Sequence, residues 1–87
     1  MKIIAEYELS TEGSTLLLPA KYKVVCLQRR TDHISIFIEH EQQTAKKRFP
    51  VRFSTYKSYK EVAGEYVDTV FSGGVSGEAL HVYRVSV

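Results

Sequence analysis

Apolar and polar residues alternate along much of this chain, which is the pattern of strands with one buried face. Between Lys2 and Leu9 every second residue, starting at Ile3, is apolar, and two glutamates occupy intervening positions. The same alternation recurs at residues 48–53, 64–71 and 79–85. Because successive side chains of a strand point to opposite faces, each segment is predicted to pack one face against a core.

Three further segments read as strands without strict alternation. Residues 15–18 are apolar and are stopped by Pro19, and residues 34–41 are rich in β-branched and aromatic side chains. Residues 21–30 contain an apolar run at Val24–Leu27, which predicts a central strand buried on both faces.

Turn residues predict how these strands connect. The first two strands are expected to pair as a hairpin across Ser10–Ser14, and the strands at 21–30 and 34–41 as another across Thr31–His33. Pro50 predicts an edge position or a bulge, because proline has no backbone N–H to donate. Three glycines are expected to supply the positive φ angles of a last hairpin: Gly73, Gly74 and Gly77.

The fold class that follows is all-β. We expect residues 1–87 to form a single β domain of about seven short strands, either a small antiparallel sheet or a partly open barrel or sandwich. Residues 55–63 are the least strand-like and hold at most one helical turn, the alternative being an irregular loop.

Composition indicates what kind of protein carries this fold. The apolar fraction of 44% and the charged fraction of 25% are those of an ordinary globular domain. A net charge of +2 is too weak to identify a nucleic-acid binder. The single cysteine, Cys26, rules out an internal disulfide, and no apolar run is long enough for a signal peptide or a membrane span, so a cytoplasmic location is expected.

The sequence gives little support to catalysis or metal binding. The three histidines and Cys26 lie in separate segments without metal-ligand spacing, so no metal or cofactor is expected. Cys26 sits in the apolar run and is predicted to be a small buried hydrophobe. The carboxylate pairs Glu6/Glu8 and Glu39/Glu41 occupy solvent-like strand positions. We therefore expect a protein that is not an enzyme.

Basic residues interleaved with tyrosines are the best candidates for function. The tentative binding residues are Lys21, Lys23, Arg29, Arg30, Tyr56, Lys57, Tyr59, Lys60 and His81. Tyrosine and arginine are typical of protein-interface hot spots, which favours a binding module for a protein partner or for a second copy of the chain. Lysines that neutralise phosphates beside rings that stack on bases leave a single-stranded nucleic-acid or nucleotide binder as the alternative.

His81 is the histidine considered for a catalytic role. It shares a strand face with Tyr83, and the prediction is a partly buried histidine hydrogen-bonded to a neighbour. It would act in function only if that face opens onto a cavity.

The chain resembles a group of small phage-encoded β-domains of unknown function. The matching segments are Phe49–Thr55, the Y-V-x-T-V pattern at Tyr66–Val70, and the G-x-x-L-H-V-Y pattern from Gly77 to Tyr83, with a looser match at Tyr7–Leu9, Leu16–Pro19 and Gln28. Tyr56 and Asp68 stand where the group has glycine, and Ala79 or Leu80 replaces its tryptophan. The resemblance implies a phage origin and a small β fold, and thus action in the host cytoplasm on a host protein or by forming a homodimer. It implies no activity.

Overall fold

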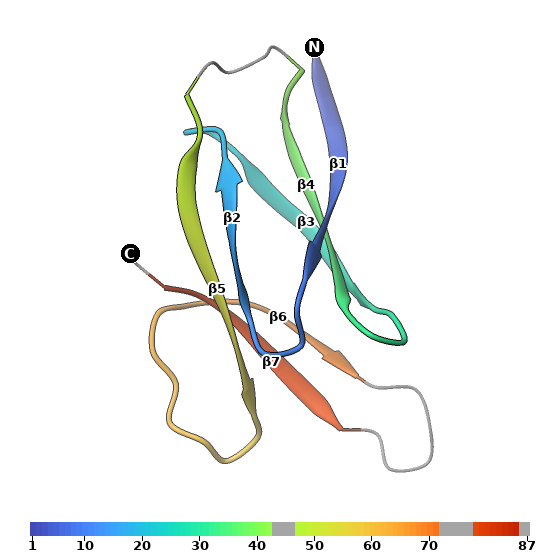
Figure 1. Ribbon diagram of the computed structural model, residues 1–87, viewed down its shortest axis with the longest axis vertical. Helices are drawn as coiled ribbons and strands as arrows, with labels where there is room; N and C mark the ends of the chain where they lie inside the picture. The colour runs from blue at the N-terminus through green and yellow to red at the C-terminus, as the bar shows by residue number, and fades with distance from the viewer. Residues whose placement is uncertain (43–46, 72–77, 86–87) are drawn as a thin grey trace.

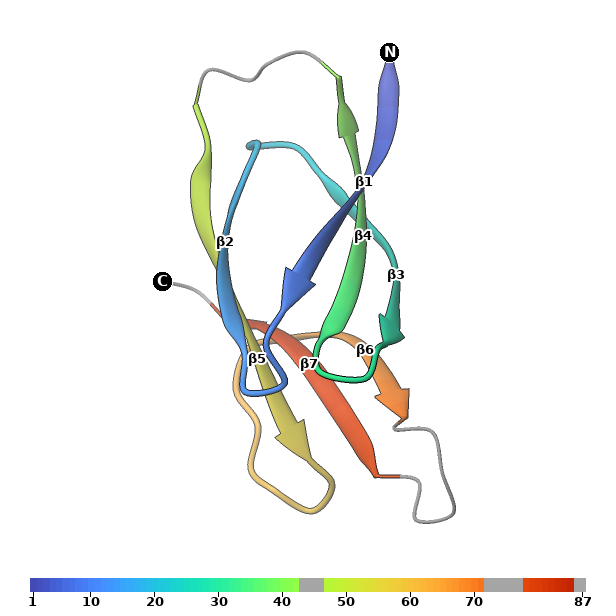
Figure 2. The ribbon, with the colours of Figure 1, turned by 45° about the vertical axis from the view of Figure 1, so that its right-hand side comes forward.

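The computed structural model describes residues 1–42, 47–71 and 78–85, and its strands form two antiparallel sheets (Figures 1 and 2). The seven strands are β1 (Lys2–Leu9), β2 (Ser14–Leu18), β3 (Lys23–Arg29), β4 (Ile34–Glu41), β5 (Phe49–Lys57), β6 (Glu65–Phe71) and β7 (Ala79–Val85). Sheet A has the order β1-β4-β3 and sheet B the order β2-β5-β7-β6. Strands β3 and β6 come into contact where the sheets meet, but the sheets do not close into a barrel. The all-β prediction is confirmed.

The core lies between the facing sides of the two sheets. Sheet A contributes Ile34, Ile36 and Ile38, and sheet B contributes Phe53 and Val82, all completely buried. These residues alternate with outward-pointing neighbours, as the period of two predicts. Burying a side chain of this size stabilises the folded state by about 1.5–3 kcal/mol, so the inner faces supply most of the driving force for folding.

The predicted hairpin of the first two strands is wrong. Strand β1 pairs with β4 and β2 pairs with β5, so consecutive strands belong to different sheets. The turn between them carries the chain from one sheet to the other: the Ser14 hydroxyl accepts a hydrogen bond from the Ser10 N–H at 2.8 Å, and Gly13 has a φ of +104°. Leu9 and Leu18 are thereby buried from opposite sides of the core, which pairing within one sheet would prevent.

The prediction of a central, buried strand at residues 21–30 is also wrong. Strand β3 lies at the edge of sheet A and β4 is the central strand. A β-bulge between Val24 and Cys26 adds a residue to β3, and both Val25 and Cys26 are exposed. The bulge breaks the alternation that would turn one of them inward, so Cys26 is not the buried hydrophobe that its neighbours suggest.

Other expectations of the fold hold in part. Strands β3 and β4 form the predicted hairpin, closed by a 2.9 Å hydrogen bond from the Arg30 N–H to the His33 carbonyl. The edge position or bulge expected at Pro50 is not found, because β5 is an inner strand of sheet B with a regular register; Pro50 pairs with Leu17 of β2, and the described part of β7 pairs with β5 from Arg52 onward. Strand β5 continues to Lys57, and residues 58–64 form an irregular loop without a helical turn.

Strands β6 and β7 pair as predicted, but Gly73, Gly74 and Gly77 lie outside the described residues. The described part of the chain contains no helix that is long and apolar enough to cross a membrane.

Candidate binding face on sheet B

The outer side of sheet B carries a group of aromatic and hydroxyl side chains that we name the Tyr/His face. It comprises Tyr56, Tyr66, Thr69, His81 and Tyr83. They alternate along the strands with the core-facing side chains of β5, β6 and β7, and this alternation aims them away from the core. Cross-strand pairing then brings residues that are far apart in sequence next to one another: Tyr56 and Thr69 both lie opposite His81.

Tyr83 lies at the centre of the aromatic part of this face. Its ring centroid is 5.6 Å from that of Tyr56 and 5.5 Å from that of Tyr66, with interplanar angles of 84° and 69°. Such edge-to-face pairs are favoured by the ring quadrupoles and contribute about 0.5–1.5 kcal/mol beyond the buried area. The three rings therefore hold one another in defined orientations, while Tyr66 stays 53% exposed.

A chain of hydrogen bonds crosses the polar part of the face. The Tyr66 hydroxyl lies 2.7 Å from Thr69 Oγ1, which lies 2.9 Å from His81 Nδ1, and His81 Nε2 lies 2.9 Å from Ser58 Oγ. Both imidazole nitrogens thus have partners, and the prediction of a partly buried, hydrogen-bonded His81 is confirmed. The residue lies on the outer face of the sheet and is held in place there.

The nine predicted binding residues do not form one patch. Tyr56 and His81 belong to the Tyr/His face, and the loop after β5 carries Tyr59 and Lys60. Tyr59 is fully exposed with a φ of +69°.

The remaining basic residues lie in three other places. Lys21 and Lys23 line a hollow of about 250 Å³ with Lys2, Glu39 and His40. Arg29 and Lys57 line a different hollow at the end of the core. Arg30 belongs to a polar cluster on sheet A, in which it pairs with Glu6.

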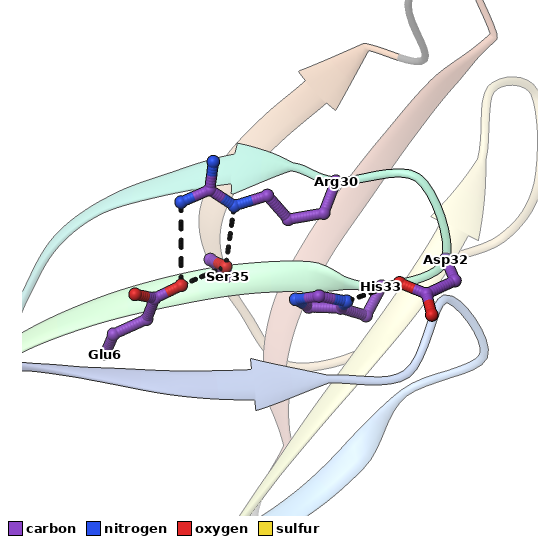
Figure 3. Close-up of polar contacts among 5 residues, drawn as sticks. All are labelled: Glu6, Arg30, Asp32, His33 and Ser35. Atoms are coloured by element: carbon purple, nitrogen blue, oxygen red, sulfur yellow. Dashed lines mark hydrogen bonds and ion pairs between the residues drawn. The ribbon is translucent and has the colours of Figure 1, made fainter.

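That cluster, shown in Figure 3, joins Glu6, Arg30 and Ser35. The Ser35 hydroxyl donates to Glu6 Oε2 at 2.5 Å, Arg30 Nε donates to Ser35 Oγ at 3.1 Å, and Arg30 Nη2 lies 3.6 Å from the same carboxylate. The Ser35 hydrogen bond, and after it the Arg30 charge, holds the pKa of Glu6 below its ordinary value. The sequence did not reveal Ser35, because a serine within an apolar strand carries no sign of its partners.

A serine, a histidine and an aspartate lie close together in this region, as in a hydrolytic triad. His33 Nδ1 is 2.7 Å from Asp32 Oδ1, and this contact lowers the pKa of the aspartate. Ser35, however, is completely buried and gives its hydrogen to Glu6. The geometry is that of paired charges around a turn, and it does not present a serine nucleophile to a substrate.

His40 forms a second polar group, and it continues the inward positions of Ile34, Ile36 and Ile38. It is 94% buried, its Nδ1 donates to the Glu41 carbonyl at 2.8 Å, and its Nε2 lies 3.3 Å from the Tyr7 hydroxyl. With Nδ1 as donor, the neutral ring accepts from Tyr7 at Nε2. The strand alternation was the available signal for this buried site.

The residues that the structure describes were also considered as ligands of a metal ion. No group of three or more His, Cys, Asp or Glu side chains within them is arranged to hold an ion.

Comparison with known proteins identifies the family. A family model described as "Domain of unknown function (DUF7352)" matches residues 1–87, so the chain belongs to this family. Neither a curated protein nor a solved structure is significantly similar to the chain.

Proposed function

We propose that this chain is a small, non-enzymatic binding module that associates with a second copy of itself through the Tyr/His face. The observation that carries the proposal is a sheet face whose rings, one exposed and two half-buried, are held in place by one another and whose polar side chains have hydrogen-bond partners. Tyrosine gives a large contact area, and rings held in advance lose little conformational entropy when a partner binds.

The absence of formal charge from the five residues of the face favours a second copy as the partner. In a two-fold symmetric interface the same patch meets itself, so a charged patch would face its own charge. The tyrosine and threonine side chains of the face avoid this repulsion. Arg52, which shares the outer side of β5, pairs with Val85 at the end of the face, where a rim charge would lie.

Sedimentation over a concentration series up to about 1 mM tests the proposal. We expect a monomer–dimer equilibrium that Tyr66→Ser weakens at least tenfold, since losing an interface ring costs about 2 kcal/mol. Tyr59→Ser is the matched control, because Tyr59 is more exposed but lies in the loop, off the face. Circular dichroism verifies that both variants are folded.

A wild-type protein that stays monomeric throughout the series would refute self-association. Equal weakening by the two substitutions would show that dimers form through another surface.

The resemblance to phage β-domains supports a phage origin, and a phage-encoded module would act in the host cytoplasm. The exposed thiol of Cys26, with no second cysteine in the chain, fits a reducing compartment. A host protein is then the other candidate for the Tyr/His face, and its binding would be lost with Tyr66→Ser even if the chain were a strict monomer.

Single-stranded nucleic acid or a nucleotide is the second candidate ligand. The supporting observation is the fully exposed ring of Tyr59 next to Lys60, close in sequence to Tyr56 on the Tyr/His face. Fluorescence anisotropy with a labelled thymidine oligonucleotide should show binding that weakens steeply with salt, with a log–log slope of about −0.7 per phosphate neutralised. No binding at low salt would eliminate this candidate.

A further inference from the structure

A separate hollow lies at one end of the core, between the two sheets and away from the Tyr/His face. It has a volume of about 310 Å³ and is lined by Thr11, Glu12, Arg29, Lys57, Glu78 and Leu80. These residues come from the β1–β2 turn, from the end of β3 in sheet A, from the end of β5 and the start of β7 in sheet B, and from Glu78, which directly precedes β7. We name it the inter-sheet hollow.

Two of its cations occupy core-facing positions. Arg29 lies opposite Ile34 in sheet A, and Lys57 lies opposite Leu80 in sheet B. Because cross-strand partners share a face, both basic side chains start out toward the inside of the molecule. The Lys57 side chain reaches solvent from this position and is 67% exposed, whereas Arg29 is half-buried. Charged residues are rarely buried without a partner, so the inward position of Arg29 needs an explanation.

The two cations differ in how they are satisfied. Lys57 Nζ lies 3.3 Å from Glu78 Oε1, which compensates its charge. Arg29 Nη1 is buried and has no hydrogen-bond partner, the one such side-chain atom among the residues that the structure describes. Burying a guanidinium nitrogen without a hydrogen-bond acceptor costs folding free energy, and such atoms are rare in native structures.

The geometry points to a small-oxyanion site in the inter-sheet hollow, with Arg29 as the principal ligand of a carboxylate or a phosphate. The guanidinium presents donors in a planar fork that matches two oxygens of such a group, and its Nη1 is a donor for which the described residues provide no acceptor. Lys57 lies across the hollow on the facing sheet, with its charge compensated by Glu78.

Glu12 and Glu78 also line the hollow and limit what it accepts. Glu78 is engaged with Lys57, whereas the Glu12 carboxylate opposes an incoming anion. The site is therefore predicted to bind weakly and to tighten when the charge of Glu12 is removed.

NMR titration of the full chain with inorganic phosphate and, separately, sodium acetate tests the inference, with sodium chloride at matched ionic strength as the reference. The Arg29 side-chain Nε–Hε signal and the Leu80 amide should shift saturably with an oxyanion and not with chloride. Tighter saturation by phosphate would assign the site to phosphorylated ligands, and tighter saturation by acetate to carboxylates.

Arg29→Met should weaken the binding at least tenfold, as followed at the Leu80 amide. Arg30→Met is the matched control: the same change at the next residue, whose side chain binds Glu6 and Ser35 on the outer side of sheet A. Glu12→Gln should tighten the binding about threefold, the effect of removing one weakly interacting like charge. If Arg29→Met does not fold, Arg29→Lys, which keeps the charge but loses the fork, should still weaken the binding.

Equal shifts with chloride, shifts that never saturate, or equal weakening by Arg29→Met and Arg30→Met would overturn the inference. None of these results depends on whether the chain dimerises.

Discussion

The outer sides of the two sheets differ in kind, although their inner sides are built alike. Sheet A displays charges that are largely paired with one another, such as Arg30 with Glu6 and Lys2 with Glu39. Sheet B displays rings and hydroxyl groups without formal charge at its centre, with Tyr83 between Tyr56 and Tyr66. Paired surface charges keep a face hydrated and contribute little stability, whereas exposed, ordered rings suit binding. The same alternation thus produces a charged outer side on sheet A and an aromatic one on sheet B, and it is the aromatic side for which we propose a partner.

The largest expected effects fall on the inner sides, where the two sheets should behave alike. Phe53→Ala in sheet B should lower the free energy of unfolding by about 3–5 kcal/mol and Ile36→Ala in sheet A by about 2–5 kcal/mol, since both residues are completely buried. Leu17→Ala, at a position that is 60% exposed on sheet B, is the control and should cost far less. Urea denaturation measures all three. An unchanged free energy of unfolding for Phe53→Ala would mean that sheet B does not contribute to the core.

A somewhat smaller loss of stability is expected from substituting Gly64, which lies beside the β6–β7 pair of sheet B. Gly64 has a φ of +101°, and a Cβ there would collide with the carbonyl oxygen of Arg84 at the β6–β7 pair of sheet B. Gly64→Ala should therefore destabilise the protein by about 2 kcal/mol through strain and displacement of β6. The control is Ala63→Gly at the exposed neighbouring position, which should cost less than about 1 kcal/mol. Thermal denaturation measures the melting temperatures of both variants. A Gly64→Ala variant that melts at the wild-type temperature would contradict the predicted strain.

The hydrogen bonds of the Tyr/His face should contribute less again. Thr69→Val keeps the shape of the side chain but removes the hydroxyl between Tyr66 and His81, so a loss of about 1 kcal/mol is expected. The same substitution should alter the His81 imidazole signals in NMR spectra, because Nδ1 loses its partner. Thr15→Val, at an exposed position of β2 in the same sheet, is the control. Unchanged imidazole signals would contradict the hydrogen-bonded chain.

The smallest effect concerns the charged outer side of sheet A and depends on pH. The pKa of Glu6 is lowered from its ordinary value of 4.5, chiefly by the Ser35 hydrogen bond, so the carboxylate binds protons less readily in the folded than in the unfolded state. Its stabilising effect is present above that ordinary value and is lost as the pH falls through the lowered value. Glu6→Gln should therefore flatten the acid side of the stability profile.

Glu8→Gln, two residues along the same exposed side, removes the same charge and provides the control for this measurement. Chemical denaturation between pH 3 and pH 7 gives both profiles. Parallel profiles for wild type and Glu6→Gln would show that Ser35 and Arg30 do not favour the ionised form.

The elements of this fold were predictable from alternation or from β-branched and aromatic composition, and the faces were predictable from alternation. The segments Lys2–Leu9 and Ile34–Glu41 coincide with β1 and β4, and the face shared by His81 and Tyr83 is the one observed. What failed was pairing: β1 and β2 join different sheets, because partner choice depends on which side of the core each strand covers, and local sequence does not encode this.

The candidate sites were predictable only in part. The bulge at Val25 shifts the register of β3 and exposes Cys26, an effect that an apolar run conceals. The basic and aromatic residues were identified by type, but the alternation of side chains turns Arg29 and Arg30 to opposite sides of sheet A, and sheet pairing brings Tyr66 to Tyr83. Such groupings arise from tertiary structure and have no counterpart in sequence spacing.

The central claim, that the Tyr/His face binds a second copy, is tested most directly by NMR contacts between copies. In a mixture of ¹³C-labelled and unlabelled chains at a concentration where dimers form, isotope-filtered spectra select protons of different molecules. The claim predicts intermolecular contacts among the rings of Tyr56, Tyr66 and Tyr83. Contacts confined to other residues, or none at a concentration where sedimentation shows dimers, would contradict it.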